Sequence, residues 1–122
     1  MFKRVDYVMV TVSDMARSVQ FYRDTLGIPL RFESPYWTEF DTGDTVLALH
    51  GGGKPTTQSS ESLAGTASIG FYVENLIQRY DELREKGVRF SLPPTDRDDE
   101  GIKLAVCLDP DGLPISIAER HK

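Results

Sequence analysis

The 122-residue sequence contains a single cysteine, Cys107, which excludes an internal disulfide framework and suits a reducing compartment. It has no apolar run near the roughly 18 residues that cross a bilayer, and no signal-peptide core opens the chain. Basic residues are the minority, because 14 Lys and Arg face 19 Asp and Glu for a net charge of −5. Phosphate binding needs clustered positive charge. We therefore expect a cytoplasmic protein with neither a membrane nor a nucleic-acid partner.

The composition that remains is typical of one globular domain. Hydrophobic residues make up 39% and charged residues 27%, and 122 residues is close to the commonest domain size. In the first segment, Tyr7 and Met9 alternate with Val8, Val10 and Val12, which predicts a strand with two different faces. The valines are expected to pack on a helix, so Tyr7 and Met9 point to the other side.

The order of predicted elements then runs twice along the chain. The first half is predicted to begin with the strand Val5–Val12 and a helix capped by Asp14 and ended by Gly27. Three strands follow, at Ile28–Phe32, Trp37–Asp41 and Thr45–His50. The second half repeats the order, with Asn75 and Gly87 bounding its helix and strands at Ser68–Val73, Val88–Leu92, Lys103–Leu108 and Pro114–Ala118. A repeat of this length indicates duplication.

The duplicated order predicts an α+β fold of two βαβββ modules, each with a curved antiparallel sheet. Module 1 is expected at about residues 1–51 and module 2 at about 66–119. Between them, residues 52–65 are rich in Gly, Ser and Thr, which predicts a linker.

Two segments resemble a known family. Val8–Asp14, followed by Phe21-Tyr22 and Leu26-Gly27, is similar to the opening signature of vicinal oxygen chelate proteins, the glyoxalase, bleomycin-resistance and extradiol-dioxygenase family. Leu108–Gly112 with Ile115–Ile117 is similar to their final hairpin. The resemblance implies an eight-stranded curved cup with its helices outside, and frequent completion of the cup by a second copy. A homodimer is therefore expected.

The resemblance also implies where a metal site would lie. Metal-dependent members place a His in the first strand, a Glu in the fourth, a His or Gln in the fifth and a Glu in the eighth. These positions fall on Tyr7, Ala48, Ser68 and Ser116. Divalent transition metals need several imidazole, thiolate or carboxylate donors, which alanine and neutral serine do not supply. We expect no metal ligand and no cofactor.

The positions expected to line the cup are instead aromatic, apolar or hydroxylic: Tyr7, Met9, Trp37, Ala48, His50, Ser68, Tyr72 and Ser116. Such side chains suit a flat or amphiphilic organic molecule. They could equally fill the cup or pack at a dimer interface. In the third strand, the residues that face the cup could be either Trp37 and Glu39 or Tyr36 and Phe40.

Two functions follow from these residues. One is a metal-free protein that binds a small organic compound, as the antibiotic-sequestering branch of the family does. The alternative is a lyase, isomerase or dioxygenase-like enzyme with an atypical site built from His50, Glu39 and Tyr7. His50 is the candidate general base, although an exposed histidine at a strand end is the simpler interpretation.

Two other features are interpreted as structural. Asp96–Gly101 is similar to the start of a calcium loop, but Cys107 stands where the loop needs its glutamate, so a charged hairpin loop is expected. His121 is placed in the C-terminal tail. Cys107 itself lies between two apolar residues of a predicted strand, which indicates a buried thiol.

Overall fold

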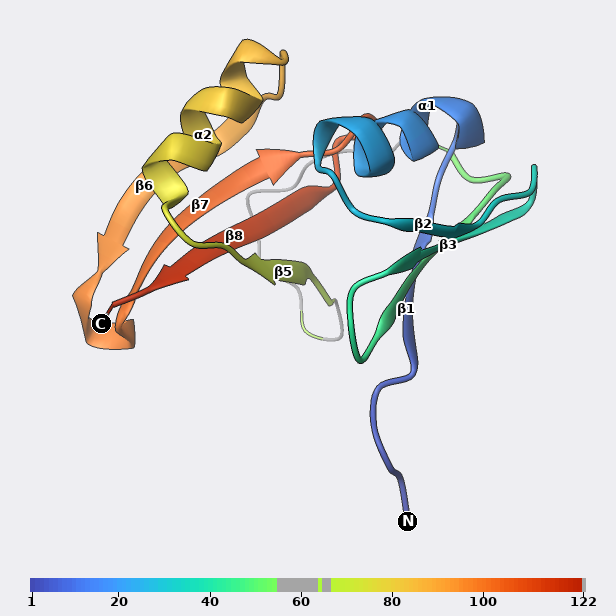
Figure 1. Ribbon diagram of the computed structural model, residues 1–122, viewed down its shortest axis with the longest axis horizontal. Coiled ribbons are helices and arrows are strands. Elements are labelled where there is room, and N and C mark those ends of the chain that lie inside the picture. The colour runs from blue at the N-terminus through green and yellow to red at the C-terminus, as the bar shows by residue number, and fades with distance from the viewer. Residues whose placement is uncertain (55–63, 65–66, 122) are drawn as a thin grey trace. The chain divides into compact units, whose positions relative to one another are not determined.

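The structure is a computed structural model that describes residues 1–54, 64 and 67–121, in two compact units, Met1–Pro55 and Thr56–Lys122 (Figure 1). The first unit contains β1 (Tyr7–Thr11), α1 (Met15–Gln20), a π-helical turn (Phe21–Thr25), β2 (Leu30–Phe32), β3 (Trp37–Asp41) and β4 (Val46–His50). The second contains β5 (Ile69–Tyr72), α2 (Leu76–Glu85), β6 (Phe90–Arg97), a 3₁₀ turn (Asp98–Glu100), β7 (Ile102–Leu108) and β8 (Pro114–Arg120). In the described residues, no helix combines the length and apolar character that a membrane crossing requires.

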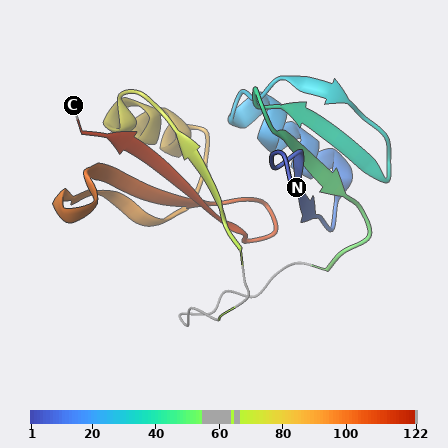
Figure 2. The ribbon, with the colours of Figure 1, turned by 90° about the horizontal axis from the view of Figure 1, so that it is seen from below.

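The two units share one topology. The first sheet has the strand order β1-β4-β3-β2, and the second has the order β5-β8-β7-β6. In each unit a helix lies against one face of the sheet (Figure 2). The predicted α+β class with two βαβββ units is confirmed, whereas the joining of the two sheets into one cup stays a prediction. Most of the predicted linker lies outside the described residues.

The prediction of purely antiparallel sheets is wrong. The first strand of each unit pairs in parallel with the last, as β1 does with β4 and β5 with β8. A helical crossover returns the chain so that the next strand runs in the direction of the first. Two hairpin reversals later the chain runs in that direction again, and the last strand can pair beside the first only in parallel.

The core of the first unit lies between its sheet and the helix. Val10 and Val12 are buried, while Val8 near the start of the edge strand is partly exposed. Tyr22 and Phe40 are fully buried and meet with ring centroids 6.0 Å apart. The Asp14 side chain accepts a hydrogen bond of 3.0 Å from the backbone N–H of Arg17, so the predicted cap is confirmed.

The start of α2 is built differently from the sequence prediction. Asn75 makes no side-chain capping hydrogen bond, and its backbone is left-handed with φ of 62°. The carboxylate of Glu119, on β8, accepts a hydrogen bond of 2.7 Å from the backbone N–H of Leu76 instead. An anion at a helix N-terminus is favourable because the first N–H groups there have no partner within the helix. A contact 43 residues away in sequence thus replaces the local cap.

Replacing Glu119 should therefore destabilise the second unit. We expect Glu119→Ala to lower the free energy of unfolding by about 1–2 kcal/mol, the usual cost of a lost helix cap. Glu74→Ala is the matched control, because Glu74 is exposed and close to the same helix start, and its loss should cost less than about 0.5 kcal/mol. Urea denaturation measures both, and equal effects would show that the Glu119 bond is not the cap.

The second core lies between α2 and its sheet. It contains Leu76, Ala105, Cys107, Ile115 and Ile117, all buried. Tyr80 of α2 meets Phe90 of β6 edge to face, with ring centroids 4.6 Å apart. The strand β6 is longer than predicted and extends to Arg97, so the charged segment expected to be all loop begins within a strand.

Candidate functional site

One face of the first sheet collects most of the residues singled out in the sequence. Met9, Ala48 and Glu39 lie in one register row across β1, β4 and β3. Thr11, His50 and Trp37 form the next row. Residues in register share a face of the sheet. The residues Tyr7, Met9, Trp37, Glu39, Ala48 and His50 therefore form one surface, which we call the aromatic face.

The centre of the aromatic face is Trp37. Its ring meets Tyr7 edge to face, with centroids 6.0 Å apart, and meets His50 in the same manner at 6.3 Å. The open question about the third strand is resolved in favour of Trp37 and Glu39, because Phe40 is buried beside Tyr22 on the helix side. Tyr7 is 54% and Met9 is 48% exposed in this unit, so apolar surface is available there for contact.

A polar group adjoins the aromatic rings. The indole Nε1–H of Trp37 donates a hydrogen bond of 2.8 Å to Oε2 of Glu39, and Nε of Arg31 lies 3.7 Å from the other carboxylate oxygen. One contact thus reaches each oxygen of the Glu39 carboxylate. A cavity of about 470 Å³ adjoins this group, a volume that suits a small organic molecule. It is lined by Arg4, Asp6, Tyr7, Arg31, Trp37, Glu39, Gly43, Asp44 and Val46.

The two positions of the first unit where the family resemblance would place metal ligands carry no imidazole or carboxylate. Ala48 is fully buried between Met9 and Glu39 and carries only a methyl group. Tyr7 offers a phenol, whose hydroxyl is a weak donor compared with imidazole or carboxylate. Glu39 is the nearest carboxylate in the register, and it already binds Trp37 and Arg31.

His50 lies at the end of β4 with an exposed side chain. Its backbone carbonyl accepts a hydrogen bond of 2.8 Å from the N–H of Val12, which anchors the strand end. Its ring contacts the edge of Trp37. In the antiparallel pair of β3 and β4 it is a diagonal neighbour of Glu39, at a backbone separation of about 7–8 Å.

The second unit holds the other three predicted residues. Ser116 of β8 lies opposite Gly70, and by the alternation of β5 the side chains of Ser68 and Tyr72 belong to the same face. Ser68 is exposed and immediately precedes β5, so the strand begins one residue later than predicted. Tyr72 is 57% exposed, and the guanidinium carbon of Arg120 lies 5.4 Å from its ring centroid. Ser68 and Ser116 offer only neutral hydroxyls to a metal ion.

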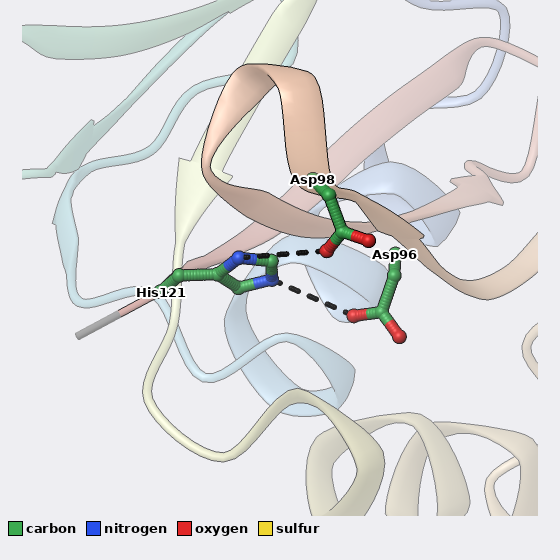
Figure 3. Close-up of side chains that lie close together, drawn as sticks. All are labelled: Asp96, Asp98 and His121. Carbon is green, nitrogen blue, oxygen red and sulfur yellow. Dashed lines mark ion pairs between the residues drawn. The ribbon is translucent and has the colours of Figure 1, made fainter.

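A separate group of metal-type donors lies at the far end of the second sheet. Figure 3 shows the His121 ring between two carboxylates, with Nε2 3.5 Å from Asp96 and Nδ1 3.9 Å from Asp98. His121 lies after the last strand, in the C-terminal segment as expected, and its backbone N–H donates to the carbonyl of Gly101 at 2.8 Å. The three side chains are exposed, and each ring nitrogen faces a different carboxylate. One ion could take only one of these nitrogens.

The sequence interpretation missed two cations beside the predicted residues. Arg31 pairs with Glu39 because β2 lies next to β3, and Arg120 stacks on Tyr72 because β8 lies next to β5. Neither pairing has a local sequence signal. The pairing of β5 with β8 joins segments more than 40 residues apart.

Comparison with known proteins gives consistent results. The model of the Glyoxalase/Bleomycin resistance protein/Dioxygenase superfamily matches residues 4–117. An uncharacterized protein, YraH of Bacillus subtilis, is 32% identical over 119 residues, covering 90% of this chain and 93% of its own length. A probable lactoylglutathione lyase of Synechocystis is 27% identical over 125 residues, covering 93% and 92%. The crystal structure of SMU.1112c aligns with a TM-score of 0.82 at 28% identity, covering 98% of this chain and all of that one.

Proposed function

Because this chain belongs to the Glyoxalase/Bleomycin resistance protein/Dioxygenase superfamily, we propose that it is a metal-free member that binds a small aromatic or amphiphilic organic compound. The observation that carries the proposal is the aromatic face, where Tyr7 and Trp37 meet edge to face beside a cavity of about 470 Å³. Aromatic side chains of this kind contribute apolar contact and ring stacking to a planar ligand.

The donor chemistry supports the absence of the family's metal site. Tyr7, Ala48, Ser68 and Ser116 stand at the four ligand positions that the family resemblance implies. A neighbouring carboxylate could replace a missing ligand, and Glu39 is the one in register with Ala48. Its two oxygens already contact Trp37 and Arg31, so an ion would have to compete with both contacts. Ligand binding in this proposal depends on shape and apolar contact. The homodimer expected from the family belongs to the same proposal.

The second candidate is an enzyme, a lyase or isomerase with an atypical site at His50 and Glu39. It is favoured by the diagonal placement of these two side chains on the aromatic face and by the similarity to a probable lactoylglutathione lyase. In this alternative His50 would act as the general base. Glu39 is poorly placed to accept a proton in this alternative, because its carboxylate already contacts Trp37 and Arg31.

Thermal melting separates the two candidates. At concentrations tenfold above their dissociation constants, indole or 2-naphthol should raise the melting temperature by about 3–6 °C, because a ligand stabilises by RT ln(1 + [L]/Kd). Trp37→Leu should abolish the shift. Tyr36→Leu is the matched control, because Tyr36 is the neighbouring, 79% exposed aromatic residue outside the aromatic face, and this variant should keep the shift. Ni²⁺, Zn²⁺, Mn²⁺ and Fe²⁺ should each shift melting by less than about 1 °C.

The metal measurements are made in a His121→Asn background, which removes the exposed His121 group as a competing donor. A large metal-dependent shift that His50→Ala abolishes would contradict the proposal and place the enzyme first. If indole and 2-naphthol raise the melting temperature equally in the wild type and in Trp37→Leu, the ligand does not use the aromatic face.

A further inference from the structure

The second unit contains a larger cavity, whose lining includes the predicted cup residue Tyr72 but not Ser68 or Ser116. It opens where β5 ends, α2 begins and β8 ends, and its volume is about 670 Å³. Figure 1 shows β5 leading into α2 and β8 ending at the C-terminal marker. This volume is within the range of small-ligand sites. The lining residues are Tyr72, Glu74, Asn75, Arg79, Glu119, Arg120 and His121.

Arg120 is the distinctive member of this lining. Its guanidinium carbon lies 5.4 Å from the ring centroid of Tyr72, within the range of cation–π contact. In the described part of the chain it has no carboxylate partner, whereas Arg31 and Arg79 each have one within 4.0 Å. A guanidinium that rests on an aromatic ring keeps the N–H groups around its edge available. Those groups form the fork that matches a carboxylate or phosphate.

Most other charged groups of the cavity are already engaged. Glu119 accepts from the backbone N–H of Leu76 at 2.7 Å. Arg79 is paired with Glu82 at 2.6 Å, which lowers the pKa of the Glu82 carboxyl. The ring of His121 lies between Asp96 and Asp98. Glu74 is exposed and carries the remaining negative charge of the lining. Among the described residues, Arg120 is thus the arginine of the lining that no carboxylate pairs with.

We infer that this cavity binds the carboxylate or phosphate group of a small aromatic anion, with Arg120 as the anion-binding residue and the Tyr72 ring as its support. The exposed remainder of the Tyr72 ring offers apolar contact to the ligand's own ring. The net charge of −5 repels anions from the protein as a whole, so binding here depends on the direct contact with Arg120. The inference goes beyond the proposed function, and it stands on residues of the second unit alone.

Titration by ¹H–¹⁵N NMR tests the inference with three probes of similar size: benzoate, phenyl phosphate and the neutral benzamide. Both anions should shift the Tyr72 amide and the Arg120 Nε–H signals in a saturable way, and benzamide should bind at least tenfold more weakly. Arg120→Gln should raise the dissociation constant of both anions about ten- to a hundredfold, the usual effect of losing a charge-assisted hydrogen bond. Arg120→Lys should also bind more weakly, because an ammonium lacks the planar fork.

Arg84 provides a matched control. Its guanidinium carbon also lies 5.4 Å from a tyrosine ring centroid, that of Tyr80, but neither residue lines the cavity. Arg84→Gln changes the net charge as Arg120→Gln does, and it should leave the dissociation constants unchanged. Equal weakening by the two variants would overturn the inference, because it would show a general charge effect. Equal binding of benzoate and benzamide would overturn it as well.

The result of this anion titration does not depend on whether the aromatic face binds a ligand. If Arg120→Gln weakens anion binding while indole leaves the melting temperature unchanged, the result would support this inference and contradict the proposed function. If Trp37→Leu abolishes indole binding while Arg120→Gln leaves the dissociation constants of the anions unchanged, the result would contradict this inference and support the proposed function.

Discussion

Phe40→Ala should lower the free energy of unfolding by about 3–5 kcal/mol, the range measured when a fully buried aromatic side chain is truncated. Phe40 is inaccessible to solvent and packs against Tyr22, which is equally buried, at a centroid distance of 6.0 Å. Removal of the ring leaves a cavity between β3 and the π-helical turn. The first unit has a small core, so one aromatic pair accounts for a large share of its apolar burial.

Phe32→Ala is the matched control for this prediction. It removes the same atoms from the neighbouring strand β2, but Phe32 is 53% exposed, and the loss should be less than about 1 kcal/mol. Because natural domains are stable by only about 5–15 kcal/mol, Phe40→Ala could leave too little folded protein to measure. Phe40→Leu then provides a milder variant, with an expected loss of about 1–2 kcal/mol. Urea denaturation that shows equal losses for Phe32→Ala and Phe40→Ala would contradict the core assignment.

The second large effect concerns Cys107 and alkaline pH. Burial raises the pKa of the Cys107 thiol from 9.0 to about 11, and the charge of Asp109 acts in the same direction. The folded state therefore holds the thiol proton more tightly than the unfolded state. The stabilisation is fully present below pH 9 and is lost as the pH rises through 11. Between pH 8 and pH 11 the loss should be about 2 kcal/mol.

Cys107→Ala isolates this contribution. Tyrosine and lysine side chains titrate in the same range, but they do so in both proteins, and the difference between wild type and variant removes them. Urea denaturation at several pH values should show that difference shrinking by about 2 kcal/mol from pH 8 to pH 11. A difference that stays constant with pH would mean that the thiol is accessible to water. The raised pKa also keeps the thiol protonated near neutral pH, which is unsuited to a nucleophile.

Several features of the fold were predictable because their causes are local. The alternation of Tyr7 and Met9 with Val8 and Val10 correctly predicted a strand with two faces, and Asp14 correctly predicted the start of the first helix. Gly27 and Gly87 both have positive φ, which explains why glycine follows each helix. The duplicated order of these signals predicted two βαβββ units.

Other predictions failed where a distant segment competes with a local one. Asn75 is a favourable capping residue by itself, but the carboxylate of Glu119 on β8 reaches the first N–H group of the same helix, that of Leu76, with a full charge. His121 lies in the C-terminal segment as expected, but the sequence did not predict that its backbone pairs with Gly101 across the hairpin. Nothing in the residues near Asn75 or His121 carries information about these partners.

The candidate site shows the same division. The sequence by itself determined which side chains are present at these positions: a phenol at Tyr7, a methyl group at Ala48 and hydroxyls at Ser68 and Ser116. Only the tertiary structure decided that Trp37 and Glu39 share the face of Tyr7. It also decided that Arg31 lies beside Glu39 and that Arg120 lies beside Tyr72. The reason is physical. Residue identity fixes what a side chain can donate or accept, whereas strand register, set by pairing between segments distant in sequence, fixes which side chains meet.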